Sequence, residues 1–329
     1  MPATMHAAVR RTYSPPKYLQ ISDLPLPSPA PEELLVRVCA TTVNRTDLAV
    51  LTGYPLAMRL FTGLIRPKRI VPGTDFAGVV EAVGERVTRF CVGDRVWGFE
   101  DRGIASQAQY MAVPVAAVEA IPEGLSFQEA AASAEGAHYA LNFLNKLSPV
   151  AGQQVLVNGG TGAIGSALVQ LLRYQGLEVT ATCPTGYVER VKALGAVKVI
   201  DFQQEDFTRL PLQFDYVFDA VGKSTFRRCA RLLKPDGVYI SSELGPGWQN
   251  IWLALLTPLR PGKRVIFPIP GNIQASLRTI RDLLERGEFR PLIDRIYPLE
   301  DIAEAYDYVK SGRKIGNVVL DLDQTPEQG

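Results

Sequence analysis

The chain has 329 residues and a formal net charge of +1; 47% of its residues are hydrophobic and 21% are charged. These values are typical of a globular protein of about two domains, and the near-neutral charge without a basic block argues against nucleic acid and against a membrane surface as partners. The four cysteines, Cys39, Cys91, Cys183 and Cys229, are too far apart in sequence for a close-spaced metal cluster. No apolar run approaches the length of a membrane span and the first residues lack an apolar signal core, so we expect a cytoplasmic protein with reduced thiols.

Residues 1 to about 120 predict a β-rich domain. Strand-forming runs lie at Met5 to Arg10 and at Leu34 to Ala40, and several prolines separate them. Between Val71 and Asp101 further short apolar runs are broken by glycines. Many short strands with glycine and proline turns are typical of a barrel-like or sandwich domain.

The pattern changes to helix near Ser126. Glu129 follows Ser126 at the spacing of a capping box, and an alanine-rich stretch continues to Ala132. A second helix is predicted from Glu135 to Lys146, because the helix-breaking Pro149 follows shortly afterwards.

Residues 153–172 predict a strand, a tight turn and an amphipathic helix in succession. Gly160, Gly162 and Gly165 have the dinucleotide-binding spacing: the first makes the turn, the second lets the backbone approach a pyrophosphate, and the third lets the helix pack on its strand. The free N–H groups and the positive dipole end of the helix favour the phosphates. The residues predicted to bind the cofactor here are Gly160, Thr161, Gly162, Ala163, Ile164 and Gly165.

From residue 153 the chain alternates between strand and helix. The predicted strands lie at 154–158, 178–182, 197–201, 215–219, 237–241 and 263–267. This alternation indicates a parallel sheet with helices on both faces, the doubly wound dinucleotide-binding fold of the α/β class. The elements predicted after it are a helix over 273–286, a strand over 293–297, a helix over 299–310 and a strand over 318–322. They exceed what this sheet needs, so we expect them to rejoin the first domain.

The order of these parts resembles the medium-chain dehydrogenase/reductase superfamily. Residues 73–84 and 92–98 are similar to the N-terminal signature of that family, and residues 159–165 are similar to the nucleotide loop of its quinone oxidoreductase branch. Three later stretches are similar to its fourth, fifth and closing strands, namely 214–222, 233–239 and 316–320.

The resemblance implies two domains and a cleft between them. The implied division is a GroES-like, β-rich catalytic domain over 1–122 and 268–329 and a Rossmann domain over 123–267. It also implies a homodimer formed through the last sheet strand, near 263–267. The segment 244–262 carries tryptophans and leucines that either cover the substrate or cover a dimer surface.

The resemblance departs from the zinc-containing members at the metal positions. Those members have a cysteine in the position of Asn44 and a histidine in the position of Thr74, and their third ligand falls near Glu135. Amide and hydroxyl oxygens do not replace thiolate and imidazole as zinc ligands. The sequence also lacks the four clustered cysteines of the structural zinc loop. We therefore expect no zinc, as in the zinc-independent, quinone oxidoreductase-like reductases.

Few polar residues are candidates for the chemistry. The resemblance implies that Asn44 hydrogen-bonds the cofactor or a substrate carbonyl, and that Tyr54 lines the cleft and donates a proton or a hydrogen bond. The alternative interpretation, with equal support, is that Tyr54 only packs a loop. For Asp47 we expect a structural role. His138, near the start of its helix, either lines the pocket or has its hydrogen bonds met by neighbouring residues.

The end of the second sheet strand decides the nicotinamide cofactor. An NAD-selective site places an acid there, whereas this chain has Thr182 and no acid before Glu189. Thr182 and Thr185 are candidates to hydrogen-bond a 2′-phosphate, and Arg190 or Lys192 to neutralise it. Gly186 stands where related reductases often carry a lysine. The sequence favours NADPH, with NADH as the alternative.

Four further cofactor-binding positions follow from the resemblance: Val221, Gly222, Leu244 and Lys314. For Lys314 and its neighbour Arg313, solvated surface residues are the alternative interpretation. The predicted function is reduction of a quinone or an α,β-unsaturated carbonyl by direct hydride transfer from NADPH. The alternatives are a zinc-free aldehyde or ketone reductase and a nucleotide-binding protein without turnover.

Overall fold

The computed structural model describes residues 3–101, 103–269 and 271–323, and the chain divides into two compact units. The first unit comprises Met1–Glu135, Ile273–Glu285 and Pro291–Gly329, and the second comprises Gly136–Asn272 and Arg286–Arg290. The domain boundaries that the resemblance implies, at 122/123 and 267/268, stay a prediction.

The first unit is built on a mostly antiparallel sheet of seven described strands in the order β14-β15-β3-β4-β5-β7, with β6 paired to β3. Their bounds are β3 (Glu33–Val43), β4 (Asp75–Val83), β5 (Arg95–Phe99), β6 (Tyr110–Pro114), β7 (Val118–Ala120), β14 (Ile293–Pro298) and β15 (Asn317–Asp321). A separate antiparallel pair is formed by β1 (Thr4–Val9) and β2 (Gln20–Pro25). The predicted β-rich start of the chain is confirmed.

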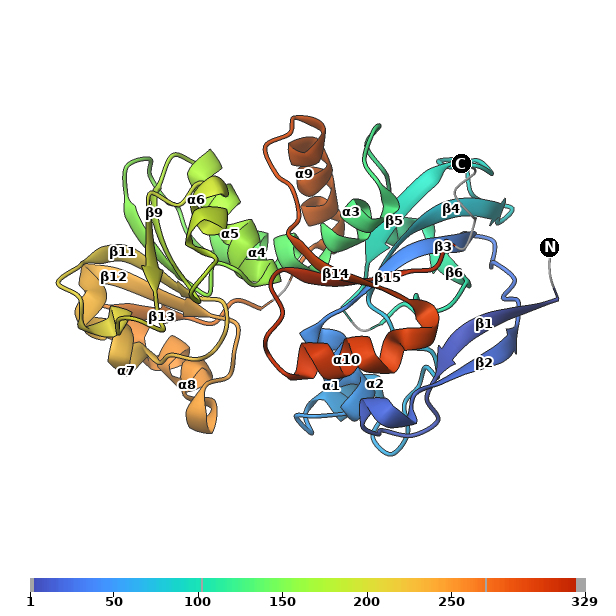
Figure 1. Cartoon of the computed structure of the whole chain (residues 1–329), viewed down its shortest axis with the longest axis horizontal. Helices are drawn as coiled ribbons and strands as arrows, with labels where there is room; N and C mark the ends of the chain where they lie inside the picture. The colour runs from blue at the N-terminus through green and yellow to red at the C-terminus, as the bar shows by residue number, and fades with distance from the viewer. Residues whose placement is uncertain (1–2, 102, 270, 324–329) are drawn as a thin grey trace. The chain divides into compact units, whose positions relative to one another are not determined.

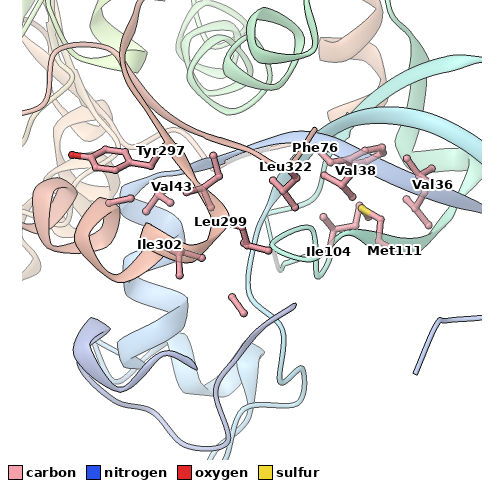
Figure 2. Packing of buried hydrophobic residues seen from close by; sticks show 14 of the residues in the cluster. Val36, Val38, Val43, Phe76, Ile104, Met111, Tyr297, Leu299, Ile302 and Leu322 are labelled. Atoms are coloured by element: carbon pink, nitrogen blue, oxygen red, sulfur yellow. The ribbon is translucent and has the colours of Figure 1, made fainter. Parts of the chain in front are cut away.

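The end of the chain completes this sheet. β15 pairs antiparallel with β3, with Val318 opposite Val43, and β14 pairs parallel with β15. The late elements therefore rejoin the first unit, as expected. The core formed beneath the sheet includes Val36, Phe76 and Met111, and Figure 2 shows them near Leu322 from the end of the chain.

Helices cover this unit where the sequence has an apolar stripe. They are α1 (Arg45–Thr52), α2 (Met58–Thr62), α3 (Phe127–Ala132), α9 (Ile273–Glu285) and α10 (Ile302–Lys310). The capping box predicted at Ser126 is confirmed, because its side chain accepts from Glu129 N and the Glu129 carboxylate accepts from Ser126 N. Helix α4 (Glu135–Leu144) begins at the last residue of this segment and leads into the second unit.

The second unit is a parallel sheet in the order β10-β9-β8-β11-β12-β13. The strands are β8 (Gln154–Asn158), β9 (Glu178–Cys183), β10 (Lys198–Asp201), β11 (Phe214–Asp219), β12 (Leu233–Ser241) and β13 (Arg264–Ile266). The helices between them are α5 (Ala163–Tyr174), α6 (Val188–Ala193), α7 (Phe226–Cys229) and α8 (Gln249–Leu256). Figure 1 shows α5 and α6 on one side of this sheet and α7 and α8 on the other.

All described strand pairs of this sheet are parallel, and its order is that of the doubly wound fold. The predicted α/β class is therefore confirmed. β12 begins earlier than the predicted start at 237, because Leu233 already pairs with Phe214 across an irregularity in the register. None of the described helices is long and apolar enough to cross a membrane.

Candidate functional site

The glycine loop lies at the carboxyl end of β8, where the strand order of the sheet reverses. A β-carbon on Gly165 would lie 2.0 Å from the Gly159 carbonyl oxygen, so the contact between α5 and the turn requires this glycine. A β-carbon on Gly162 would meet nothing closer than 3.6 Å, the distance to the same oxygen. The protein's own packing therefore does not require Gly162 to be a glycine. A pyrophosphate that approached this backbone from outside would require it.

The N-terminus of α5 carries no side-chain cap. Gly162 is the N-cap residue, and no side chain accepts a hydrogen bond from the first turn. The first turn of a helix has N–H groups without partners inside the helix, and the helix dipole adds partial positive charge there. The loop thus fits the pyrophosphate of a dinucleotide, as the sequence predicts for Gly160 to Gly165.

A buried acid, Asp219, orders the next loop at the carboxyl end of β11. Its Oδ1 accepts from Asn158 Nδ2 at 3.0 Å and from Gly222 N at 3.0 Å. Its Oδ2 accepts from the Tyr239 hydroxyl at 2.9 Å and from Ser224 N at 3.2 Å. This network fixes the backbone at Val221 and Gly222, two predicted cofactor-binding residues. Nothing in the sequence pattern pointed to Asp219 itself.

The hydroxyl of Thr182, near the end of β9, forms hydrogen bonds with residues at the start of the glycine loop. It is fully buried, donates to Asn158 Oδ1 at 2.8 Å and accepts from Gly159 N at 2.9 Å. Gly160 N also donates to the Thr182 carbonyl at 2.8 Å. Thr182 therefore shapes the glycine loop from the neighbouring strand. Its predicted contact with a 2′-phosphate stays a prediction.

An acid lies beside Thr185, although none ends β9. Asp201 ends β10, and its Oδ2 accepts from the Thr185 hydroxyl at 2.6 Å. On α6, Lys192 pairs with Glu189 at 2.8 Å, and Arg190 is exposed. The predicted 2′-phosphate site thus has a carboxylate beside Thr185, and the nearest charge to Lys192 in the described contacts is that of Glu189. The sequence reading missed Asp201 because it examined only the second strand.

In the first unit, Asn44 is the N-cap of α1. Asp47 N donates to Asn44 Oδ1 at 2.7 Å and Asn44 N donates to Asp47 Oδ2 at 3.1 Å, which makes a capping box. The other side of the amide, Nδ2, donates to Thr74 Oγ1 at 2.9 Å. Asn44 is buried, and its side chain is held from both sides.

Three buried carboxyl groups gather around this cap: Asp47, Asp75 and Glu135. Asp75 accepts from Thr42 N at 2.7 Å and from the Thr42 hydroxyl at 2.6 Å, while Glu135 accepts from the Thr46 hydroxyl at 2.7 Å. Burial raises the pKa of all three, and the charge of Glu135 raises the pKa of Asp47 and Asp75 further. For Asp75 the result is a pKa of about 7. The sequence reading did not foresee this cluster.

We expect the raised pKa of Asp75 to make stability depend on pH. Because the folded pKa of about 7 exceeds the ordinary value of 3.8, the folded state holds this proton more tightly than the unfolded state. The contribution of this group to the free energy of unfolding is therefore greatest below the ordinary pKa and falls as pH rises through the folded pKa, by about 4 kcal/mol in all. Asp75→Asn should reduce the loss of Tm between about pH 5 and about pH 8.

Thermal unfolding followed by circular dichroism across this pH range checks the expectation. Asp307→Asn, which changes an exposed acid on α10, is the matched control and should leave the pH profile unchanged. An Asp75→Asn protein that loses as much Tm on alkalinisation as the parent would contradict it.

The remaining predicted residues of the first unit lie in different surroundings. Lys314 donates to the Gly316 carbonyl at 2.6 Å, and the negative charge of Glu135 raises its pKa while burial, the larger effect, lowers it. Tyr54 follows α1 and is 73% exposed. Whether either contacts a ligand stays a prediction.

Two other predicted residues lie in the second unit. His138 Nε2 lies 2.9 Å from Asn142 Nδ2 on the same helix, and the histidine is fully buried, which agrees with the interpretation that it is satisfied locally. Leu244 follows β12, and its carbonyl accepts from Asn250 N at 3.2 Å.

The side chains at the metal positions do not fit zinc. Asn44 and Thr74 offer neutral oxygens that already hydrogen-bond each other or the cap, and Glu135 is the one carboxylate of the set. Across residues 3–101, 103–269 and 271–323, no group of three or more His, Cys, Asp or Glu side chains is placed to hold a metal ion. No step of the chemistry is therefore derived through a metal.

Two protein families match the chain. The alcohol dehydrogenase GroES-like domain matches residues 30–123, and the zinc-binding dehydrogenase family matches residues 194–320. The first match covers strands β3 to β7 of the first unit. The second runs from the end of α6 to β15 and so includes Asp219.

Relatives named for their reductase activities match over nearly the whole chain. A 2-methylene-furan-3-one reductase from Solanum lycopersicum is 30% identical over 97% of this chain and 80% of its own length. An NADPH-dependent alkenal/one oxidoreductase from Arabidopsis thaliana is 28% identical over the same shares. Among solved structures, a quinone oxidoreductase from Coxiella burnetii has a TM-score of 0.83 and 26% identity, covering 97% of this chain and 99% of its own.

The sequence matches, the fold and the glycine loop agree with one another. The order of a β-rich unit, a doubly wound unit and a closing return to the first sheet is that of the structure neighbours. The chain belongs to the medium-chain dehydrogenase/reductase superfamily, in its quinone oxidoreductase-like branch.

Proposed function

We propose that this protein is an NADPH-dependent reductase that transfers hydride to a quinone or an α,β-unsaturated carbonyl without zinc. The observation that carries the proposal is the set of side chains at the metal positions, where Asn44 donates to Thr74 at 2.9 Å instead of presenting a thiolate and an imidazole. A simple ketone has to be polarised strongly for hydride attack, which a Lewis acid does well, whereas a quinone or an enone is already electron-poor. The chemistry available without a metal therefore favours conjugated acceptors.

The glycine loop supports the cofactor part of the proposal. The N-terminus of α5 would hold the pyrophosphate, and the loop ordered by Asp219 would hold the adjoining part of the dinucleotide. When bound, the nicotinamide supplies the hydride. Two relatives, an alkenal/one oxidoreductase and a 2-methylene-furan-3-one reductase, are named for the reduction of conjugated carbonyls, which supports the same substrate class.

Of the two predicted catalytic residues, Tyr54 is proposed to act on the substrate and Asn44 to position the structure around it. Tyr54 would donate a hydrogen bond to the carbonyl oxygen as charge develops on it, because its hydroxyl is exposed and forms no hydrogen bond within the described residues. Asn44 has its amide engaged by Asp47 and Thr74, so it would act by fixing the start of α1. NADPH is proposed over NADH, although Asp201 opposes this preference.

The assembly is proposed to be a cytoplasmic homodimer. Within the described residues β13 is an edge strand of the parallel sheet, with β12 on one side only. An edge strand presents unpaired backbone groups to a partner strand. Trp252 and Leu255 on the neighbouring α8 are exposed and would be covered in the same contact.

The test is the loss of NADPH absorbance with a panel of quinones, enones, aldehydes and alcohols, together with metal analysis of the purified protein. We expect turnover of quinones or enones and a rate lowered about 10-fold or more by Tyr54→Phe. Tyr18→Phe, at another exposed tyrosine, is the control. Turnover of aldehydes alone would favour the ketone and aldehyde reductase alternative. Tight NADPH binding without turnover would favour a binding protein, and stoichiometric zinc would overturn the metal-free chemistry.

A further inference from the structure

The first unit contains a cavity of about 230 Å³ with a basic lining. Arg10, Lys68 and Arg69 contribute three cationic side chains to it, and its described lining contains no acidic side chain. Arg10 follows β1, and the two other cations precede β4. Lys68 and Arg69 are exposed, whereas Arg10 is 3% exposed. The cations therefore lie both at the mouth of the cavity and at its buried end.

Arg10 is incompletely paired at the buried end. Its Nη1 donates to the Val50 carbonyl, whereas its Nε is buried without a hydrogen-bond partner in the part of the chain that the structure describes. No ion pair joins Arg10 to a carboxylate among the same residues, and its guanidinium lies 5.5 Å from the centre of the Tyr13 ring. A buried charge without a counterion is costly, so an arrangement of this kind favours an anion from outside.

The acid Asp47 does not balance the positive charge of Arg10. Asp47 raises the pKa of Arg10, but burial lowers that pKa by more. Asp47 itself has a pKa well above its ordinary range, because it is buried beside Asp75 and Glu135. Burial therefore disfavours the charged form of Asp47, which is the form that would pair with the guanidinium. Arginine stays protonated under these conditions.

The rest of the lining selects the kind of anion. Val50, Phe61 and Val71 form an apolar part of the wall. The volume lies below the range of roughly 300–1,000 Å³ that is typical of pockets for drug-sized ligands. Guanidinium groups bind carboxylates through paired N–H donors. An inorganic ion would use the cations and leave the apolar wall without a partner.

We propose that this cavity binds a small organic acid, with its carboxylate against Arg10, Lys68 and Arg69 and its short apolar body against Val50, Phe61 and Val71. The described lining of this cavity belongs to the first unit, whereas the glycine loop belongs to the second. Binding in the cavity requires neither a nicotinamide cofactor nor turnover, so its test is independent of the proposed reductase activity.

Isothermal titration calorimetry of the full chain with benzoate tests the proposal. Benzamide is the neutral isostere, and inorganic phosphate is the control anion without an apolar part. Benzoate should bind saturably and more weakly as salt is raised. The double variant Lys68→Ala/Arg69→Ala should weaken it about 10-fold or more, since it removes two charges at the mouth. Arg66→Ala is the matched control, because Arg66 is an exposed cation of the same segment outside the lining.

Arg10→Met keeps the length of the buried side chain and removes its charge, and it should abolish benzoate binding. If that variant fails to fold by circular dichroism, the double variant at the mouth decides the question. The proposal is overturned if benzoate shows no saturable binding up to about 10 mM. It is also overturned if benzamide or phosphate alone binds as well as benzoate, or if Arg66→Ala weakens binding as much as the double variant.

Discussion

Gly162→Asp is expected to fold as stably as the parent and to bind NADPH at least about 100-fold more weakly, because a carboxylate there would face the pyrophosphate at close range. Gly162 is the N-cap of α5 and has φ −72° and ψ 166°, an extended conformation that aspartate adopts without strain. Aspartate is also a preferred N-cap residue, so the free energy of unfolding should stay equal or rise by up to about 1 kcal/mol.

Gly162→Asp should lose affinity for NADPH without losing stability, and this separation distinguishes it from a variant that disturbs the fold. Gly165→Ala should do the opposite, since its β-carbon would lie 2.0 Å from the Gly159 oxygen and the helix would have to shift. Gly271→Asp adds the same charge at a glycine with open space around it and should change neither property. Thermal unfolding and the quenching of protein fluorescence by NADPH measure the two effects.

The outcome that contradicts the prediction is specific. If Gly162→Asp binds NADPH like the parent while remaining folded, the loop does not hold a pyrophosphate at this glycine. A variant that unfolds would show instead that the packing around Gly162 is tighter than the 3.6 Å contact indicates.

The fold could be predicted from the sequence where one local pattern decides one element. The apolar run of β8 and the helical spacing of α5 are both local, and both elements lie where predicted. The same holds for the capping box at Ser126. The early start of β12 could not be predicted, because Leu233 joins the strand only through its pairing with Phe214 on β11.

Only the part of the candidate site that is formed by residues close together in sequence could be predicted. The spacing of Gly160, Gly162 and Gly165 gave the loop, but the chain of hydrogen bonds that fixes it runs through Thr182, Asn158 and Asp219 on three different strands. Sequence spacing carries no information on which strand ends become neighbours until the sheet order is known.

The buried acids of the first unit escaped the sequence reading for a similar reason. Asp47, Asp75 and Glu135 belong to α1, β4 and α4, and each by itself is an ordinary acidic residue. Only the fold shows that burial raises the pKa of all three and that Glu135 adds to the rise at Asp47 and Asp75. The sequence did supply the chemical argument against zinc, because that argument needs residue types alone.

The choice between NADPH and NADH also depends on which strand ends become neighbours, which the sequence alone does not show. The sequence argument for NADPH was that no acid ends β9, yet the parallel pairing of β10 with β9 brings Asp201 to 2.6 Å from the Thr185 hydroxyl. A carboxylate at that place would repel a 2′-phosphate and would accept from a ribose hydroxyl instead. The absence of an acid from one strand therefore does not decide the preference.

Asp201→Asn is expected to raise the affinity for NADPH relative to NADH by about 10-fold, since it removes one negative charge beside the 2′-phosphate in a solvent-exposed site. The asparagine oxygen can still accept from Thr185, so the loop should keep its form. The ratio of the two dissociation constants, measured by fluorescence titration at low salt, is the readout. Glu205→Gln removes the same charge at an exposed residue after β10 and should leave the ratio unchanged. Equal shifts for both cofactors would show that Asp201 acts on the fold of the loop and not on the 2′-phosphate.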